Sequence, residues 1–235
     1  MRLHNLKTYF TTFEKLLWGI SVLLTVLSFL VFDRTNWLTL AASITGITSL
    51  IFAAKGNPLG PFLMIFFSLL YGYISLSFEY YGEMITYLGM TMPMSLFSLI
   101  AWLKNPYDKG GSEVSVNCIG PTESLLAGIL TAIVTTVFYF ILHHFGTANL
   151  LPSTVSVTTS FIAVYLTFRR SPYYALAYAT NDIILIVLWI LASLSSKVYI
   201  SVTVCFAAFL VNDIYGFINW KKMEKRQKKT IASEV

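Results

Sequence analysis

The chain has 235 residues, of which 56% are hydrophobic and only 11% charged. A soluble domain carries roughly 25% charged residues, so this chain has too little charge to cover a water-facing surface. Its net charge of +5 does not indicate nucleic-acid binding, because the basic residues are scattered between apolar runs and gathered in the last fifteen positions. These numbers exclude a soluble enzyme or DNA-binding domain and indicate a single transmembrane domain over residues 1–235.

Eight stretches are long and apolar enough to cross a bilayer, which takes about 20 mostly apolar residues. Turn residues such as Asn57–Pro58, Asn105–Pro106 and Ser171–Pro172 separate them. The sequence therefore predicts an all-α integral membrane protein with eight transmembrane helices. In chain order the expected spans are Leu16–Phe32, Trp37–Ala54, Leu59–Phe78, Glu83–Leu103, Ser124–Phe145, Leu150–Phe168, Tyr173–Leu194 and Val198–Trp220.

Two parts of the chain look alike. Asn57–Pro58 opens the third span as Ser171–Pro172 opens the seventh, and Ser98–Trp102 resembles Gly216–Trp220. This similarity predicts a parallel repeat, in which two equivalent units lie on either side of a substrate site. The alternative is that each Trp next to a Lys is merely an anchor at the membrane edge. The expected order is an extra helix at 16–32, a three-helix repeat at 37–103, a linker helix at 124–145, a second repeat at 150–220 and a basic tail at 221–235.

The basic residues predict the orientation. With eight spans and the N-terminus inside, only Arg34 and Lys197 of the 16 basic residues fall on the outer side. Cytoplasmic loops carry an excess of Lys and Arg, so this asymmetry predicts that both termini are cytoplasmic. The protein is expected in the cell membrane.

Polar residues inside the spans are the candidate site. Ionisable side chains within a membrane are costly, and they mark functional or pairing positions. Amides and carboxylates can bind hydroxyl groups, while Trp and Tyr can stack on a ring and hold a cationic ring by cation–π attraction. The candidate substrate-binding residues are Glu83, Tyr87, Tyr178, Asn181, Asp182, Trp189, Asn212, Asp213 and Tyr215.

Each of these positions has a structural alternative. Glu83 can sit at the outer interface, and Asn181 and Asn212 can hold helices together. Asp182 or Asp213 can pair with a basic residue near the cytoplasmic ends. Catalytic motifs, cofactor motifs and metal-ligand spacings are absent from the sequence, which argues against an enzyme.

With these residues in view, the chain resembles the PnuC family of vitamin and nucleoside transporters. The resemblance covers roughly residues 35 to 226. The motifs that carry it are Leu70-Tyr-Gly72, Tyr81-Gly-Glu-Met84, Met92-Pro-Met94 with Trp102, Asn181-Asp182 with Trp189, and Asn212-Asp-Ile-Tyr-Gly-Phe-Ile-Asn-Trp220-Lys. Span four has Met92-Pro-Met94 and Ser98 where the family pattern is more polar and aromatic.

The resemblance implies a 3+1+3 arrangement similar to that of SWEET transporters, preceded by an extra helix. It also implies import of nicotinamide riboside by facilitated diffusion, with a cytoplasmic kinase trapping the product by phosphorylation. Similar proteins carry deoxynucleosides, thiamine or riboflavin. A non-transporting receptor or scaffold and a membrane enzyme acting on lipid are the alternatives of another class, and a homo-oligomer is compatible with the sequence.

Overall fold

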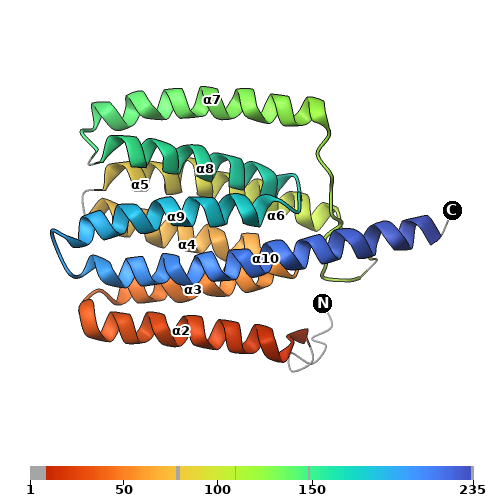
Figure 1. Ribbon diagram of the computed structural model, residues 1–235, viewed down its shortest axis with the longest axis horizontal. Helices are drawn as coiled ribbons and strands as arrows, with labels where there is room; N and C mark the ends of the chain where they lie inside the picture. The colour runs from red at the N-terminus through yellow and green to blue at the C-terminus, as the bar shows by residue number, and fades with distance from the viewer. Residues whose placement is uncertain (1–8, 78–79, 109, 148, 234–235) are drawn as a thin grey trace.

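The computed structural model describes residues 9–77, 80–108, 110–147 and 149–233, and these form a bundle of helices that lie side by side (Figure 1). Among the described residues, eight helical spans have the length and apolar composition needed to cross a membrane. The helices are α2 (Thr12–Phe32), α3 (Trp37–Ala54), α4 (Leu59–Ser77), α5 (Tyr81–Thr86), η1 (Tyr87–Thr91), α6 (Met92–Lys104), α7 (Pro121–His144), α8 (Leu150–Phe168), α9 (Tyr174–Ser193) and α10 (Tyr199–Ser233).

The predicted spans match these helices to within a few residues at most ends. Phe78, the predicted end of the third span, lies outside the described residues. The first span begins four residues earlier than predicted, at Thr12, because Thr11 and Glu14 form a capping box there.

The fourth span is not a continuous α-helix. It runs through α5, a π-helical turn at η1 and then α6. Pro93, just past the π-helical turn, has no N–H to donate, and in a regular α-helix its ring would clash with the carbonyl of Gly89. The wider turn relieves this conflict, and it brings Tyr87 and Thr91 to the interior of the bundle.

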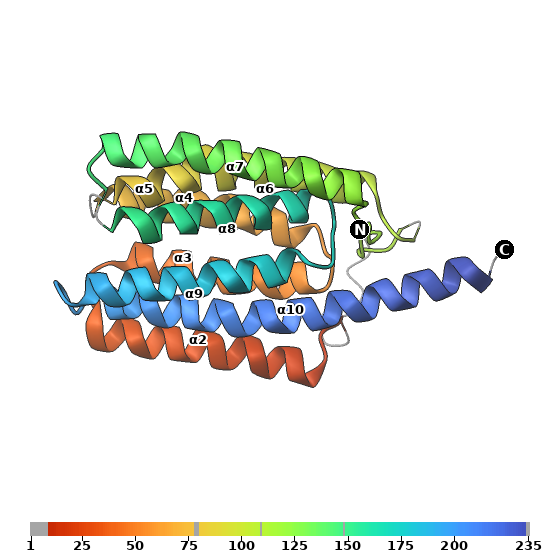
Figure 2. The same cartoon turned by 45° about the horizontal axis from the view of Figure 1, so that its top comes forward.

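The last helix is longer than predicted. The sequence predicts a span that ends at Trp220, whereas α10 continues to Ser233 and projects from the bundle (Figures 1 and 2). The extension packs against the loop before α7. Gln227 accepts a hydrogen bond from the Val116 N–H at 2.7 Å and donates one to the Val114 carbonyl at 3.1 Å. These contacts explain why the basic tail is helical.

Following the predicted repeat, we group the spans by chain order into two sets of three, with two additional helices. We call α3, α4 and the α5–η1–α6 span the first triplet, and α8, α9 and α10 the second triplet. The triplets meet along two joints, one where α3 packs on α10 and one where α6 packs on α8. Helix α7 packs on α8 at one edge of the bundle, and α2 packs on α3 and α10 at the opposite edge (Figure 1).

The turns after α3 and α8 have the same geometry. Gly56 and Arg170 both have a positive φ, at 64° and 57°. The Gly56 N–H donates to the Ala53 carbonyl at 2.9 Å, and the Arg170 N–H donates to the Thr167 carbonyl at 3.0 Å. Each turn thus closes a helix with one residue in the left-handed region.

Both turns lie at the end of the bundle from which α10 projects. Val114 donates its N–H to the Gly56 carbonyl at 2.9 Å, and Asn117 donates its N–H to the Arg170 carbonyl at 3.0 Å. We call this the basic end, and we call the end with Arg34 and Lys197 the opposite end.

Trp102 and Trp220 are not anchors at the membrane edge, which was the alternative interpretation of the sequence. They are 1% and 0% exposed, and they lie among aromatic rings at the basic end. Each indole N–H donates to a main-chain carbonyl of the other triplet. A helical period cannot tell a lipid-facing Trp from one that faces a neighbouring helix, which explains the error.

Candidate functional site

A small cavity lies between the two triplets, in the middle of the bundle. Its volume is about 20 Å³, roughly what one water molecule needs. Both triplets line it. The polar lining residues are Tyr87, Thr91, Ser160, Tyr178, Asn181, Asp182 and Asp213, and the apolar ones are Leu50, Met64, Phe67, Phe206 and Phe209. Five of the nine predicted site residues therefore meet in this central cavity: Tyr87, Tyr178, Asn181, Asp182 and Asp213.

Two carboxyl groups face each other in the central cavity. Asp182 on α9 and Asp213 on α10 are each 3% exposed, and their side chains lie close enough to interact. Asp182 Oδ2 has no hydrogen-bond donor within reach among the described residues. Buried carboxylates in proteins are normally paired with a cation or with donors. This pair therefore provides acceptors that a cationic or hydroxyl-bearing ligand can satisfy.

Asn181 is partly used by the bundle itself. Its side-chain oxygen accepts hydrogen bonds from Thr159 at 2.8 Å and from Ser160 at 3.0 Å, both on α8. These bonds fix the amide so that its nitrogen is the group left to face a ligand. Asn181 thus both connects α8 to α9 and lines the central cavity.

Aromatic rings form one wall of the central cavity. The rings of Tyr71 and Tyr87 have centroids 4.5 Å apart, and Phe67 packs edge-on against Tyr87 at 5.7 Å. Phe206 and Phe209 of α10 contact the same group of rings. Rings in this arrangement offer flat faces on which a heteroaromatic ligand can stack.

Glu83 and Trp189 lie in a second cavity, nearer the opposite end, with a volume of about 10 Å³. We call it the outer cavity. Three buried polar atoms along its wall have no hydrogen-bond partner among the described residues, and these are Glu83 Oε2, Thr147 Oγ1 and Trp189 Nε1. Unpaired buried groups are costly. Their gathering in one cavity favours a place where a ligand passes.

The outer cavity is closed by rings. The Trp189 ring contacts Tyr80 at 5.1 Å and Tyr199 at 5.5 Å between centroids. Burial raises the pKa of the Tyr80 phenol, and Tyr199 beside it raises the pKa further. The phenol therefore stays protonated, and it can donate a hydrogen bond.

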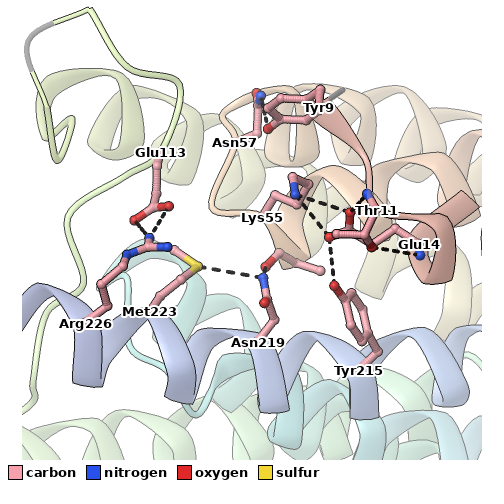
Figure 3. Close-up of polar contacts among 11 residues, drawn as sticks. Tyr9, Thr11, Glu14, Lys55, Asn57, Glu113, Tyr215, Asn219, Met223 and Arg226 are labelled. Atoms are coloured by element: carbon pink, nitrogen blue, oxygen red, sulfur yellow. Dashed lines mark hydrogen bonds and ion pairs between the residues drawn. The ribbon is translucent and has the colours of Figure 1, made fainter. Parts of the chain in front are cut away.

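Asn212 and Tyr215 do not reach either cavity. Asn212 donates to Ser21 of α2 at 2.9 Å and to the Ala208 carbonyl at 2.8 Å. Tyr215 donates to Glu14 of α2 at 2.7 Å (Figure 3). One residue along a helix turns the side chain by about 100°, so Asn212 faces α2 while its neighbour Asp213 faces the cavity.

Asn212 and Tyr215 share a face with Asn219, whose amide donates to the Ala54 carbonyl of α3 at 2.7 Å. This stripe binds α2 and α3, and the face beside it lines the cavity.

Several lining residues were missed. Thr91 lies four residues after Tyr87, and Phe209 and Phe206 lie four and seven residues before Asp213. Extending the same helical spacings would have found all three. Ser160 gave no comparable signal, because one more hydroxyl in a span rich in Ser and Thr does not stand out.

A polar cluster at the basic end was also missed. Glu14 of α2 is 2% exposed, and it accepts hydrogen bonds from the Thr11 N–H, Lys55 and Tyr215 (Figure 3). The three partners come from the N-cap of α2, from the turn after α3 and from α10. We call these four residues the Glu14 cluster, and it fastens the N-terminal helix to both triplets.

The fold and the cavities define a multi-pass helical membrane protein of the transporter class, with a polar and aromatic site enclosed between two groups of helices. The chain belongs to the nicotinamide mononucleotide transporter family, which matches residues 36–222. It is thus a member of a transporter family and not of an enzyme family.

Two relatives are named as the nicotinamide riboside transporter PnuC. The one from Neisseria mucosa is 29% identical over 201 residues, which cover 83% of this chain and 76% of the relative. The one from Haemophilus influenzae is 24% identical over 193 residues, which cover 81% and 82%.

A solved structure has the same fold. The crystal structure of the vitamin B3 transporter PnuC matches with a TM-score of 0.81 and 26% identity, over 93% of this chain and 94% of that chain.

Proposed function

We propose that this protein imports nicotinamide riboside across the cell membrane by facilitated diffusion. The two relatives are named as carriers of this nucleoside, and the central cavity has the chemistry that it requires. Nicotinamide riboside joins a positively charged pyridinium ring to a ribose with several hydroxyl groups. A site for it needs anionic acceptors, a ring face and a hydrogen-bonding amide.

The carboxyl pair of Asp182 and Asp213 is the observation that carries the proposal. A cationic ring beside it supplies the missing counter-charge, and the face of Tyr87 adds cation–π attraction. Asn181 then donates to a ribose hydroxyl or to the carboxamide oxygen. In the outer cavity, Glu83 and Trp189 offer the same combination of acceptor and ring on the way in.

The two triplets are proposed as a parallel repeat that gives alternating access. The equivalent turns at Gly56 and Arg170 and the paired joints α3–α10 and α6–α8 support this reading. A central cavity of about 20 Å³ is far too small for a nucleoside, so the triplets must move apart to admit one.

We assign the basic end to the cytoplasm, with both termini inside. Lys55, Arg169 and Arg170 lie at that end, together with the basic extension of α10. An excess of Lys and Arg marks cytoplasmic loops. A cytoplasmic kinase that phosphorylates the imported nucleoside would keep it inside. Because the free nucleoside would stay scarce in the cytoplasm, its own gradient would drive uptake without an ion gradient.

The closest alternative is a carrier of another vitamin or nucleoside. Thiamine also has a cationic ring, whereas riboflavin and deoxynucleosides are neutral. The facing carboxyl groups favour the cationic ligands over the neutral ones.

A binding experiment tests the proposal. Purified protein in detergent is titrated calorimetrically with nicotinamide riboside, thiamine, riboflavin and deoxycytidine. We expect nicotinamide riboside to bind most tightly. Tighter binding of a neutral ligand would refute the substrate assignment, and binding of none of them would favour a receptor or scaffold.

Uptake into proteoliposomes tests the mechanism. Collapsing the proton and sodium gradients should leave the initial rate of nicotinamide riboside uptake unchanged. A rate that falls several-fold would show ion coupling, for which the buried carboxyl groups would be the first place to look.

A further inference from the structure

The two tryptophans at the basic end make reciprocal hydrogen bonds between the triplets. Trp102, at the end of α6, donates its indole N–H to the Thr167 carbonyl of α8 at 2.9 Å. Trp220, on α10, donates its indole N–H to the Ala53 carbonyl of α3 at 2.8 Å. Each triplet thus gives one indole and receives one, at the equivalent position.

Both acceptors lie where a helix ends. Ala53 and Thr167 are in the last turns of α3 and α8, where carbonyl groups have no partner further along the helix. Each carbonyl also accepts the N–H of the following turn residue, and its second lone pair takes the indole. The bonds therefore join two helix ends that must separate if the basic end opens.

The indole rings also close the space between the triplets. Their centroids are 5.3 Å apart, and the Tyr174 ring lies 4.9 Å from that of Trp220. Val114, from the loop before α7, is buried in the same cluster. These four residues seal the basic end, and we call them the aromatic plug.

A third cavity lies directly behind the plug. Its volume is about 20 Å³, and the residues that line it include Ala53, Thr167, Tyr174, Ser98 and Tyr178. We call it the inner cavity. Tyr174 of the plug lines this cavity directly, and the lining residues Ala53 and Thr167 are the acceptors of the two indoles, so the plug lies next to the cavity. Tyr178 lines both this cavity and the central one, which makes the two neighbours along one path.

We propose that Trp102 and Trp220 are the cytoplasmic gate of the transporter, and that breaking both indole bonds opens the inner cavity to the cytoplasm. This inference rests on the proposed function for the assignment of the basic end to the cytoplasm. The contacts that form the gate do not depend on that assignment. The two indole hydrogen bonds join the triplets at equivalent positions, so each bond forms one half of the gate. Loss of either half should loosen it by a similar amount.

Thiol labelling tests the gate without any substrate. The reporter is Ser98→Cys, which places a thiol in the inner cavity, where the serine hydroxyl has no hydrogen-bond partner in the described part of the chain. It is made in a Cys118→Ser, Cys205→Ala background, since these are the two native cysteines. A charged, membrane-impermeant thiol reagent is added to the basic side of proteoliposomes.

We expect Trp102→Phe and Trp220→Phe each to raise the labelling rate of the reporter about tenfold, by similar factors. Phenylalanine keeps a buried ring but removes the N–H, so the change reports the hydrogen bond. Trp37→Phe is the matched control, because that indole is exposed on α3 at the opposite end, and it should leave the rate unchanged. Melting temperatures are measured in parallel to separate gate opening from unfolding.

Val114→Ala provides a second route if either Phe variant fails to purify. It shortens one side chain of the plug and leaves both indoles in place, so labelling should rise several-fold. Unchanged labelling in the Phe variants at a normal melting temperature would overturn the gate, and so would unchanged labelling in Val114→Ala. A wild-type protein that binds no nicotinamide riboside would overturn the proposed substrate and leave the labelling result standing.

Discussion

Two buried clusters of polar side chains lie within the bundle, and they differ in how their carboxylates are satisfied. In the Glu14 cluster at the basic end, both carboxylate oxygens accept hydrogen bonds (Figure 3). In the central cavity, Asp182 Oδ2 has no donor from the residues that the structure describes, and the Asp182 carboxyl group interacts with that of Asp213. The Glu14 carboxylate is fully paired with donors, whereas the central pair brings two like-charged groups together, and a cation can compensate this repulsion.

This difference supports our proposal that the ligand binds in the central cavity. A buried polar group without a partner costs about 1–3 kcal/mol, and more if it is charged. A protein that needs only stability has no use for such a group. We therefore expect changes in the Glu14 cluster to affect stability and changes in the central cavity to affect binding.

The largest effect is expected at Glu14. In Glu14→Ala, Lys55 and Tyr215 lose their common partner, and α2 loses its attachment to both triplets. We expect the free energy of unfolding to fall by about 3 kcal/mol, measured by titration with denaturing detergent. Nicotinamide riboside affinity of the folded fraction should stay within about twofold of the wild-type value.

The control for this prediction is Glu123→Ala. Glu123 pairs with Arg169 where α7 meets α8, but these side chains are 24% and 37% exposed. An exposed ion pair contributes under about 1 kcal/mol, so this variant should be nearly as stable as the wild type. Equal losses in the two variants would show that burial of Glu14 is not what matters.

Asp182→Asn should have the opposite effect to Glu14→Ala, since it should weaken binding and leave stability intact. It removes the charge that faces a cationic ring, so the affinity for nicotinamide riboside should fall about 10- to 100-fold. Stability should not decrease, because the like-charged neighbour Asp213 no longer opposes it. Calorimetry with the reduced form of the nucleoside, which has nearly the same shape but a neutral ring, shows whether the loss of affinity depends on the charge of the ring.

The reduced nucleoside should lose less than about threefold in affinity for Asp182→Asn. If both forms weaken equally, the carboxylate acts through a hydroxyl group of the ribose instead of the ring.

Substitutions of Asn181 and Asn212 should give different results in the same calorimetric assay. Asn181→Ala removes an amide that lines the cavity, and nicotinamide riboside should bind about tenfold more weakly. Asn212→Ala removes a contact with Ser21 of α2, so it should cost about 1 kcal/mol of stability and leave affinity unchanged. Reversed outcomes would place the site on the α2 side of α10.

The smallest effect is expected for Tyr215→Phe. It removes one hydrogen bond to Glu14, while Lys55 and the Thr11 N–H still satisfy the carboxylate. A loss of about 1 kcal/mol in stability is expected, with unchanged uptake into proteoliposomes. A substantial drop in uptake at normal stability would show that Tyr215 takes part in substrate binding.

The fold could be predicted from sequence to a large extent because length and apolar composition decide which segments cross a bilayer. Helical spacing also shows which polar residues of a span share a stripe. It could not show which neighbour each stripe meets. Asn212 and Asp213 illustrate this limit, since adjacent residues of one helix face α2 and the cavity respectively. Trp102 and Trp220 illustrate it again, because burial and exposure to lipid favour the same residue types.

The Glu14 cluster could not be predicted for another reason. Its members lie about 40 and 200 residues apart in the chain, and α2 lies outside the repeat. A single Glu before an apolar run gives the pattern of an ordinary helix cap, which Glu14 also is. Only the packing of α2 against both triplets shows its second role.

The most direct test of this account is an experimental structure of the protein with nicotinamide riboside bound. We predict the ligand between the triplets, with its pyridinium ring against Tyr87 and within about 6 Å of the Asp182 carboxylate. The Glu14 cluster should be unchanged in that complex. A ligand bound against Asn212 and Tyr215, on the α2 side of α10, would contradict the central claim.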